Sequence, residues 1–165
     1  MKHAAILAIV IATSSACGGT DPGRLQSEVA GNATGDPQIF HGNCLAGWVV
    51  SLDLQFNETQ GVDVSLDLLS YRLFDEGRET VIGSENLDGA TLEERYGSRV
   101  IPAHGARIFR IGLPSGLRPQ GPILVTGSAV GLDENGNGVN LSFRLTADLV
   151  VHDPEPSDGG ACPPQ

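Results

Sequence analysis

Residues 139–151, VNLSFRLTADLVV, carry an apolar side chain at every second position without a break. Successive side chains of a β-strand point to opposite faces, so this period of two predicts a strand with one face in a core and the other in solvent. A helix repeats every 3.6 residues and would scatter the same apolar residues around its whole circumference. The segment therefore restricts the chain to folds that contain a half-buried sheet.

The same alternation appears in the middle of the chain. Residues 50–57, VSLDLQFN, predict a half-buried strand, and residues 62–68, VDVSLDL, predict a second one with Leu68 on the inward side. From Leu69 onward the apolar residues change phase and include Tyr71. A phase change of this kind predicts a β-bulge or a break in the strand.

Shorter segments predict the remaining strands, at residues 79–83, 106–113 and 121–132. The last of these forms a hairpin with residues 139–151. Residues 84–98 show no clear period and predict an irregular crossover, in which Thr91 and Glu94 have the spacing of a capping box for a single helical turn. About seven strands without a convincing amphipathic helix predict an all-β fold, an immunoglobulin-like antiparallel β-sandwich.

The N-terminus has the layout of a secretory leader. Lys2 and His3 precede the apolar residues 4–12, a stretch too short to span a bilayer. Residues 13–19, TSSACGG, resemble the lipobox of bacterial lipoproteins, which implies a lipid on Cys17. Ser14 stands where that pattern usually has an apolar residue, and with Ala16 it also satisfies an ordinary signal peptidase cutting at the same bond.

The cysteines favour lipidation. The chain has 3 cysteines, and lipidation of Cys17 leaves Cys44 and Cys162, which either pair as a disulfide or stay free thiols. Acyl chains on Cys17 would anchor the protein to a membrane, each buried CH2 contributing roughly 0.8 kcal/mol. The expected location is the bacterial cell envelope, with the outer membrane favoured and the domain facing the periplasm or the exterior.

Composition marks the boundaries of the folded unit. We expect a signal peptide at 1–16, a lipidated cysteine and flexible tether at 17–37, the sandwich at 38–152 and a disordered tail at 153–165. Residues 17–37 and 153–165 are rich in Gly, Pro, Ser and Asp and lack any apolar period.

One short motif resembles a known family. The sequence YRLFD, residues 71–75, followed by Glu76 and Gly77, is similar to the FxLYD motif with its two aromatic residues exchanged. Residues 54–59 and 101–109 are similar to the strands on either side of that motif. The resemblance, to the FxLYD and CARDB kinds of bacterial immunoglobulin-like domain, implies a fold and a non-catalytic role in binding, adhesion or spacing. It implies no functional residue.

Catalytic and cofactor motifs do not appear. His41, His104 and His152 lack the spacing of a metal site, no nucleophile elbow or phosphate-binding loop occurs, and we expect no enzyme activity and no cofactor. With 20 acidic residues against 10 basic ones, a nucleic-acid partner is not expected. Three aspartates, Asp53, Asp63 and Asp67, could line one face and bind a cation, but a solvated face explains them better.

Residues 132–144, LDENGNGVNLSFR, partly match a calcium loop. Asp133, Asn135 and Asn137 stand at ligand positions in front of Gly138, but Arg144 occupies the position where the loop needs a glutamate. We therefore expect a hairpin turn, with calcium as the weaker alternative.

The preferred function is a lipid-anchored, non-catalytic module that binds another envelope protein or a polysaccharide, or that serves as a structural part of the envelope. The alternative on the same sandwich is a protease inhibitor or carbohydrate-binding module, acting through loops at 84–100 or 114–122. Trp48, the only tryptophan, precedes an alternating strand and is expected in the core rather than on a sugar-binding surface. An enzyme whose site assembles only in three dimensions is a further alternative.

Overall fold

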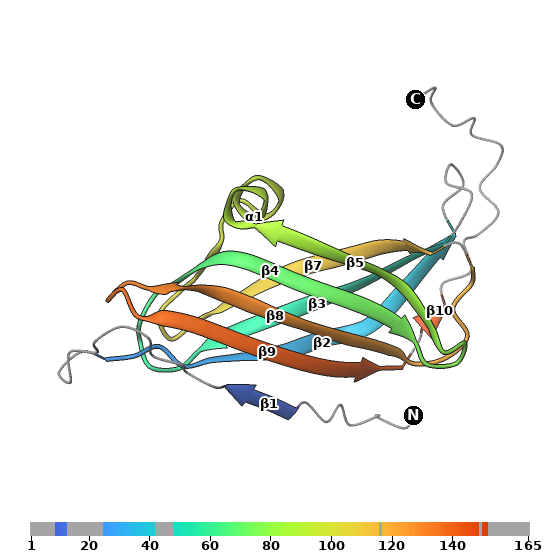
Figure 1. Cartoon of the computed structure of the whole chain (residues 1–165), viewed down its shortest axis with the longest axis horizontal. Coiled ribbons are helices and arrows are strands. Elements are labelled where there is room, and N and C mark those ends of the chain that lie inside the picture. Colours follow the sequence, from blue (N-terminus) through green and yellow to red (C-terminus); the bar gives the residue numbers. More distant parts are fainter. Residues whose placement is uncertain (1–8, 13–24, 42–47, 116, 149, 152–165) are drawn as a thin grey trace.

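Two β-sheets packed face to face form the protein (Figure 1). The structure is a computed structural model and describes residues 9–12, 25–41, 48–115, 117–148 and 150–151 of the 165-residue chain. Over these residues the two sheets pack around one core, with a single short helix at the side. The predicted all-β, immunoglobulin-like sandwich is confirmed.

The first sheet, sheet A, lies in front in Figure 1. Its strands follow the order β1, β9, β8, β4 and β5, and the short β6 also pairs with β4. Every pair in sheet A is antiparallel. The bounds are β1 (Ile9–Ala12), β4 (Val64–Asp75), β5 (Thr80–Asp88), β6 (Val100–Ile101), β8 (Ile123–Asp133) and β9 (Gly138–Ala147).

The second sheet, sheet B, has the order β10, β2, β3 and β7. Strand β10 runs parallel to β2, and the other pairs are antiparallel. The bounds are β2 (Val29–His41), β3 (Trp48–Glu58), β7 (Ala106–Ser115) and β10 (Val150–Val151). No helix in the described part of the chain is long and apolar enough to cross a membrane.

The core is built by the predicted inward residues of both sheets. Along β3, Val50, Leu52, Leu54 and Phe56 are all buried. The Phe56 ring lies 5.8 Å from the ring of Phe109 on β7 and 5.8 Å from that of Phe143 on β9, measured between centroids. Tilted aromatic pairs of this kind add about 0.5–1.5 kcal/mol each beyond their apolar burial, and the pair of Phe56 with Phe143 joins the two sheets.

The phase change in β4 is a bulge, as predicted. The register with β8 shifts between Leu66 and Leu68, yet β4 continues as one strand to Asp75. Leu66 and Leu69 are buried, whereas Leu68 is 37% exposed. The prediction that Leu68 points inward is therefore wrong, because the extra residue at the bulge reverses the facing of the side chains that follow it.

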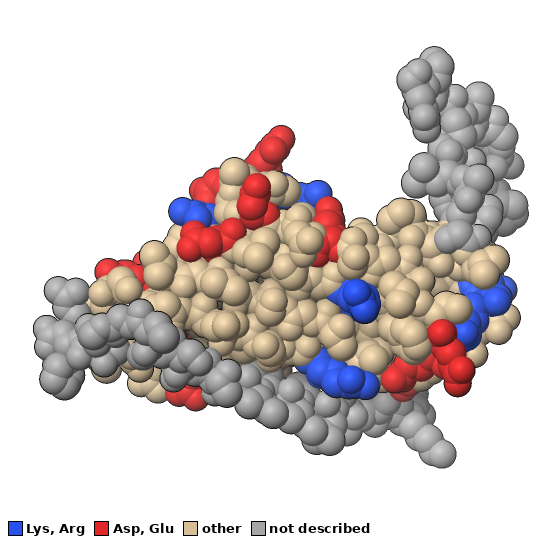
Figure 2. Space-filling view, in the orientation of Figure 1, with Lys and Arg blue, Asp and Glu red and all other residues tan. Residues whose placement is uncertain are grey.

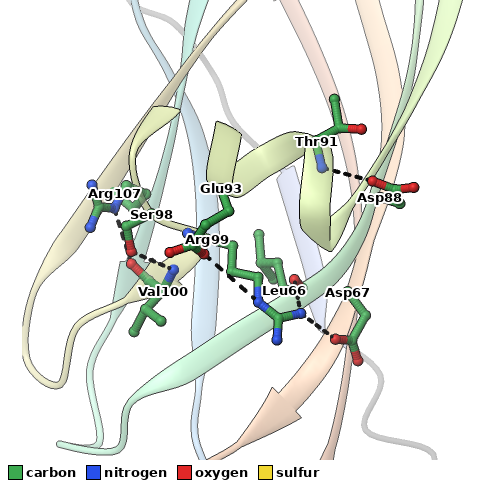
Figure 3. Close-up of polar contacts among 9 residues, drawn as sticks. All are labelled: Leu66, Asp67, Asp88, Thr91, Glu93, Ser98, Arg99, Val100 and Arg107. Carbon is green, nitrogen blue, oxygen red and sulfur yellow. Dashed lines mark hydrogen bonds and ion pairs between the residues drawn. The ribbon is translucent and has the colours of Figure 1, made fainter. Parts of the chain in front are cut away.

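The expected irregular crossover is ordered. Residues 84–88 complete β5, and α1 (Gly89–Tyr96) follows. Asp88 caps this helix, because the Thr91 N–H donates to the Asp88 carboxylate at 2.8 Å (Figure 3). Thr91 thus lies inside the helix, and the predicted capping box of Thr91 with Glu94 is wrong by three positions.

An arginine beyond the helix fastens this crossover to the bulge of β4. Arg99 donates to the Leu66 carbonyl at 3.2 Å and to Asp67 at 2.8 Å, as Figure 3 shows. The bulge leaves the Leu66 carbonyl available for this contact, so the irregular point in the strand also positions the helix.

Two predicted boundaries differ from the structure. Strand β2 begins at Val29, inside the segment expected to be a tether, and it buries Val29, Gly31 and Ala33 in alternation. The predicted strand at 139–151 ends at Ala147, and Val150–Val151 pair with β2 in sheet B instead. The alternation in β2 was not recognised because its inward residues are small. The apolar segment 139–151 contributes one strand to sheet A and a second, short one to sheet B.

Candidate functional site

The cysteines singled out in the sequence, Cys17, Cys44 and Cys162, lie outside the described residues. Lipidation and disulfide pairing therefore stay predictions. His152 is also outside them, and of His41 only the backbone, in β2, is described. His104 occupies a turn with a φ of 50°, where its N–H donates to Glu58 at 3.0 Å.

The partial calcium loop forms the hairpin turn between β8 and β9, with Gly136 at a φ of 82°. Asp133 is buried, and both of its carboxylate oxygens accept hydrogen bonds. One accepts from the N–H groups of Asn135 at 3.0 Å and Asn137 at 2.8 Å, and the other from the Asn137 side-chain amide at 2.9 Å. This geometry closes a turn and supplies no ion cage, although calcium binding itself stays untested.

The aspartates expected on polar strand faces do not share one face. Asp53 lies in sheet B and pairs with Arg110 at 2.8 Å, whereas Asp67 lies in sheet A and pairs with Arg99 at 2.8 Å. Asp63 accepts from the Ala103 N–H at 2.7 Å. Within the described part of the chain, no group of three or more histidine, cysteine, aspartate or glutamate side chains is arranged to hold a metal ion.

The buried carboxylate of Glu58 is a structural group. Burial alone would raise its pKa, but N–H groups of His104, Gln60, Gly61 and Val62 donate to it and lower the pKa to about 2. The carboxylate joins the end of β3 to two loops, and its bonding capacity is used within the protein.

The two loops predicted for a protease inhibitor or sugar-binding module differ in structure. Residues 84–100 form the end of β5, α1 and the start of β6, so they are mostly regular structure. Residues 117–122, before β8, contain neither helix nor strand and are a loop as expected. Trp48 is half-buried at the start of β3, and the Arg118 guanidinium carbon lies 5.2 Å from the centre of its ring.

A polar hollow of about 360 Å³ lies on the outward surface of sheet A. Three neighbouring strands, β5, β4 and β8, supply its outward-pointing side chains: Ser84, Asn86, Ser70, Arg72, Thr126 and Ser128. They point outward because the residues on either side of each one point toward the core side of the sheet. We call this group the polar hollow.

The strand register arranges these side chains in two parallel rows. In one row Ser84, Arg72 and Thr126 are direct cross-strand partners, and Arg144 on β9 continues it. In the other, Asn86, Ser70, Ser128 and Ser142 are partners in the same way. Directly opposed residues in an antiparallel pair lie about 5 Å apart, so neighbouring groups in a row can contact one ligand.

Charged side chains are sparse over the middle of this face. Figure 2 shows a largely uncharged surface with separate basic side chains over the middle of β4 and over β9, while acidic side chains lie around α1 and at the right-hand end of the sheet. No acidic residue lines the polar hollow. Although the chain has a net charge of −10, the polar hollow is a small surface lined by hydrogen-bond donors.

An apolar patch borders the polar hollow on the same sheet. Leu68 and Val130 are cross-strand partners, and Leu132 follows on β8. These side chains are 37%, 38% and 50% exposed. Leu68 reaches this surface because of the bulge in β4.

A network of hydrogen bonds lies directly beneath the hollow. Tyr71, which points inward between Ser70 and Arg72, donates from its hydroxyl to Glu85, and Arg95 holds Glu85 through two bonds of 3.0 and 3.1 Å. Burial opposes ionisation of Glu85, but the bonds from Arg95 and Tyr71 hold its pKa below the ordinary value. The network fixes β4, β5 and α1 together under the outward side chains.

Sequence reasoning did not identify the polar hollow. Serine, threonine and arginine on the outward phase of an alternating strand have the same pattern as any solvated face. Only the register shows that the hydroxyl groups of three strands lie side by side and that Arg72 and Arg144 flank Thr126.

Comparison with known proteins supports the fold alone. A scan against protein-family models finds no match, and neither does a search of curated protein sequences. Among solved structures, the chain is similar to a crystal structure described as the ApaA protein from Bordetella pertussis, with a TM-score of 0.54 and 14% identity, over 74% of this chain and 94% of that one. The X-ray structure of a structural genomics target has a TM-score of 0.49 and 12% identity, over 79% of this chain and 92% of that one.

Proposed function

We propose that this chain is a non-catalytic binding module, held on a bacterial envelope membrane by a lipid on Cys17, with the outer face of sheet A as its ligand surface. The observation that carries the proposal is the polar hollow. Its hydroxyl and amide groups stand in two registered rows on a rigid sheet, and none of them makes a hydrogen bond within the described part of the chain. Donors left free in this way are available to a ligand.

The rigidity of the face supports binding rather than a spacer role alone. Sheet A contributes Leu69, Leu73 and Leu145 to the core, so the backbone beneath the hollow is fixed before any ligand arrives. A preformed surface loses little conformational entropy on binding. The nearby exposed patch of Leu68, Val130 and Leu132 adds apolar area that a ligand can cover.

Membrane fractionation tests the anchor. The wild-type protein should be found in the membrane fraction, and Cys17→Ser should move it to the soluble fraction. The matched control, Cys44→Ser, should stay with the membrane. Equal fractionation of the wild type and Cys17→Ser would contradict the lipid anchor.

A steric variant tests the binding face. Ser128 lines the polar hollow from β8, next to Ser70, so Ser128→Trp should abolish binding of the purified protein to fragments of its native envelope. Ser51 is half-buried on the outward side of β3 in sheet B, which makes Ser51→Trp the matched control. Binding that is equally strong in both variants would show that the ligand contacts another surface.

A further inference from the structure

We propose that the polar hollow binds a tetrahedral oxyanion, a phosphate or sulfate group, between Arg72 and Arg144. This inference rests on the proposed function, because it names the ligand chemistry of the same face. The anion would be held by the two arginines, by Thr126 between them and by the hydroxyl groups of the neighbouring row.

Arg72 and Arg144 are placed to act together. Both pair directly with Thr126, one from β4 and one from β9, so the three residues form a single row across the sheet. Neighbouring strands lie about 4.8 Å apart, which puts the two arginine Cα atoms about 10 Å from each other. Both side chains are exposed on the outward side. Arginine side chains are long enough for both guanidinium groups to reach one group above Thr126.

Among the residues that the structure describes, these two arginines make no ion pair and no hydrogen bond. Over the described residues, Arg78, Arg95, Arg99 and Arg110 each lie within 4.0 Å of a carboxylate. Arg72 and Arg144 have neither an ion pair nor a hydrogen bond to any described residue. In a chain with twice as many acidic as basic residues, two unpaired cations flanking one threonine are available for a ligand with negative charge.

The groups beside the two arginines suit an acceptor-rich ligand. Thr126 stands between Arg72 and Arg144, and Ser70 and Ser128 add hydroxyl donors in the neighbouring row. On β5, beyond Arg72, Ser84 adds a hydroxyl and Asn86 an amide. Hydroxyl groups can also accept hydrogen bonds, but guanidinium groups only donate. Donors approach from several strands at once, which suits the several oxygens of a tetrahedral group better than the two oxygens of a carboxylate. Arginine binds such groups through two parallel hydrogen bonds.

Other ligand classes fit this face less well. A nucleic acid would bring many phosphates against a protein with a net charge of −10, whereas one or two oxyanion groups require only the local cations. A neutral sugar usually stacks on an aromatic ring, and the outward residues of the polar hollow include none.

Titration with simple anions tests the proposal. The protein is purified from membranes in its processed form, labelled with 15N and kept in a neutral detergent, and the probes are inorganic phosphate and inorganic sulfate, with chloride at matched ionic strength. We expect both probes, but not chloride, to shift the amide signals of Thr126 and Ser128. Arg72→Gln and Arg144→Gln should each weaken phosphate binding about tenfold.

The control variant is Arg110→Gln, which removes an exposed arginine from sheet B and should leave phosphate binding unchanged. Absence of anion-dependent shifts, or shifts that persist in Arg72→Gln and Arg144→Gln, would overturn the proposal. All these variants lie on the surface, and amide spectra of the free proteins verify that they fold.

Two further experiments distinguish a soluble phosphate ligand from a lipid headgroup, and they test the oxyanion site separately from the proposed binding function. Soluble glycerol phosphate and vesicles of phosphatidylglycerol present the same group on a small molecule and on a lipid, and binding of either supports the oxyanion site. If Ser128→Trp abolishes envelope binding but phosphate neither binds nor competes, the binding face stands and the oxyanion proposal fails. If phosphate binds while the protein ignores envelope fragments, the proposed function fails and the oxyanion site stands.

Discussion

Gly77 and Gly121 bring the β4–β5 turn and the loop before β8 into backbone contact. A Cβ added to Gly77 would lie 2.6 Å from the Gly121 nitrogen. The buried carboxylate of Asp75 holds the pair, because both glycine N–H groups donate to the same oxygen, at 3.0 and 3.1 Å. No side chain fits between the two backbones.

This contact predicts a strong effect of one methyl group. Gly77→Ala should force the turn away from Gly121 and lower the free energy of unfolding by about 2 kcal/mol. Gly138→Ala is the control, because a Cβ there has no heavy atom within 4 Å. Its cost should stay within about 0.5 kcal/mol. Urea denaturation measures both, and equal costs would show that the loops separate freely.

The lowered pKa of Glu58 predicts that the free energy of unfolding falls in acid. Its folded pKa of about 2 lies below the ordinary value of 4.5, so its contribution is complete above pH 4.5 and is lost as the pH falls from 4.5 toward 2. Discounted for partial solvation, that contribution is on the order of 2 kcal/mol.

The variant Glu58→Gln should lower stability at pH 7 and flatten the dependence on pH below 4.5. Glu94→Gln, on the exposed face of α1, should change neither. Denaturation curves at a series of pH values make the comparison. A Glu58→Gln profile parallel to that of the wild type would refute the assignment.

We predict that the hydroxyl groups of Tyr71 and Tyr96 resist ionisation in alkali. Burial raises the pKa of Tyr71, and the bond to Glu85 raises it further. Burial also raises the pKa of Tyr96, which packs edge-on against Phe109 with 5.2 Å between centroids. We expect no tyrosinate absorbance near pH 10, the ordinary value, until the protein unfolds.

The two tyrosines stabilise the folded protein at neutral pH and lose this effect in alkali. Both folded pKa values exceed those of the unfolded chain, so the contribution is complete below pH 10 and is lost as the pH rises above it. Tyr71→Phe leaves Glu85 without one donor and should cost about 1 kcal/mol at pH 7. Free titration of both tyrosines in the folded protein would contradict the buried network.

The hairpin at Asp133 predicts indifference to calcium. Since both carboxylate oxygens already accept hydrogen bonds from the turn, millimolar calcium should leave the melting temperature unchanged. Asp133→Ala should instead cost about 2 kcal/mol, because it leaves several partly buried N–H groups without an acceptor. Glu134→Ala, at an exposed position, is the control. A rise in melting temperature with calcium in the wild type would revive the metal-site hypothesis.

The sequence predicted the strands that bury large residues and the layer arrangement that follows from them. Val50, Leu52 and Leu54 mark β3 plainly, since an uninterrupted period of two has few other solutions. Strand β2 was missed because Gly31 and Ala33 fill the inward positions with little apolar surface. The close approach of Phe56 to Gly31 shows why small residues are needed there: a Cβ on Gly31 would lie 3.0 Å from that ring.

The polar hollow could not be predicted because it depends on register. Ser70 and Ser128 are far apart in the chain, and only the pairing of β4 with β8 makes them neighbours. The bulge before Leu68 shifts every later pair by one position. Without that extra residue, a different set of side chains would stand opposite Thr126.

The pairing of β1 with β9 determines whether the β9 edge of sheet A is covered. Ile9 lies opposite Arg144 and Ile11 opposite Ser142, so β1 runs along the β9 edge of sheet A, next to the two rows of polar side chains. Residues 9–12 belong to the expected leader. If the leader is cut off before Cys17, β1 departs, and the main-chain N–H and C=O groups of β9 lose their partners along that edge. The processed protein would then present β9 as a free sheet edge, the kind of edge to which another strand can pair.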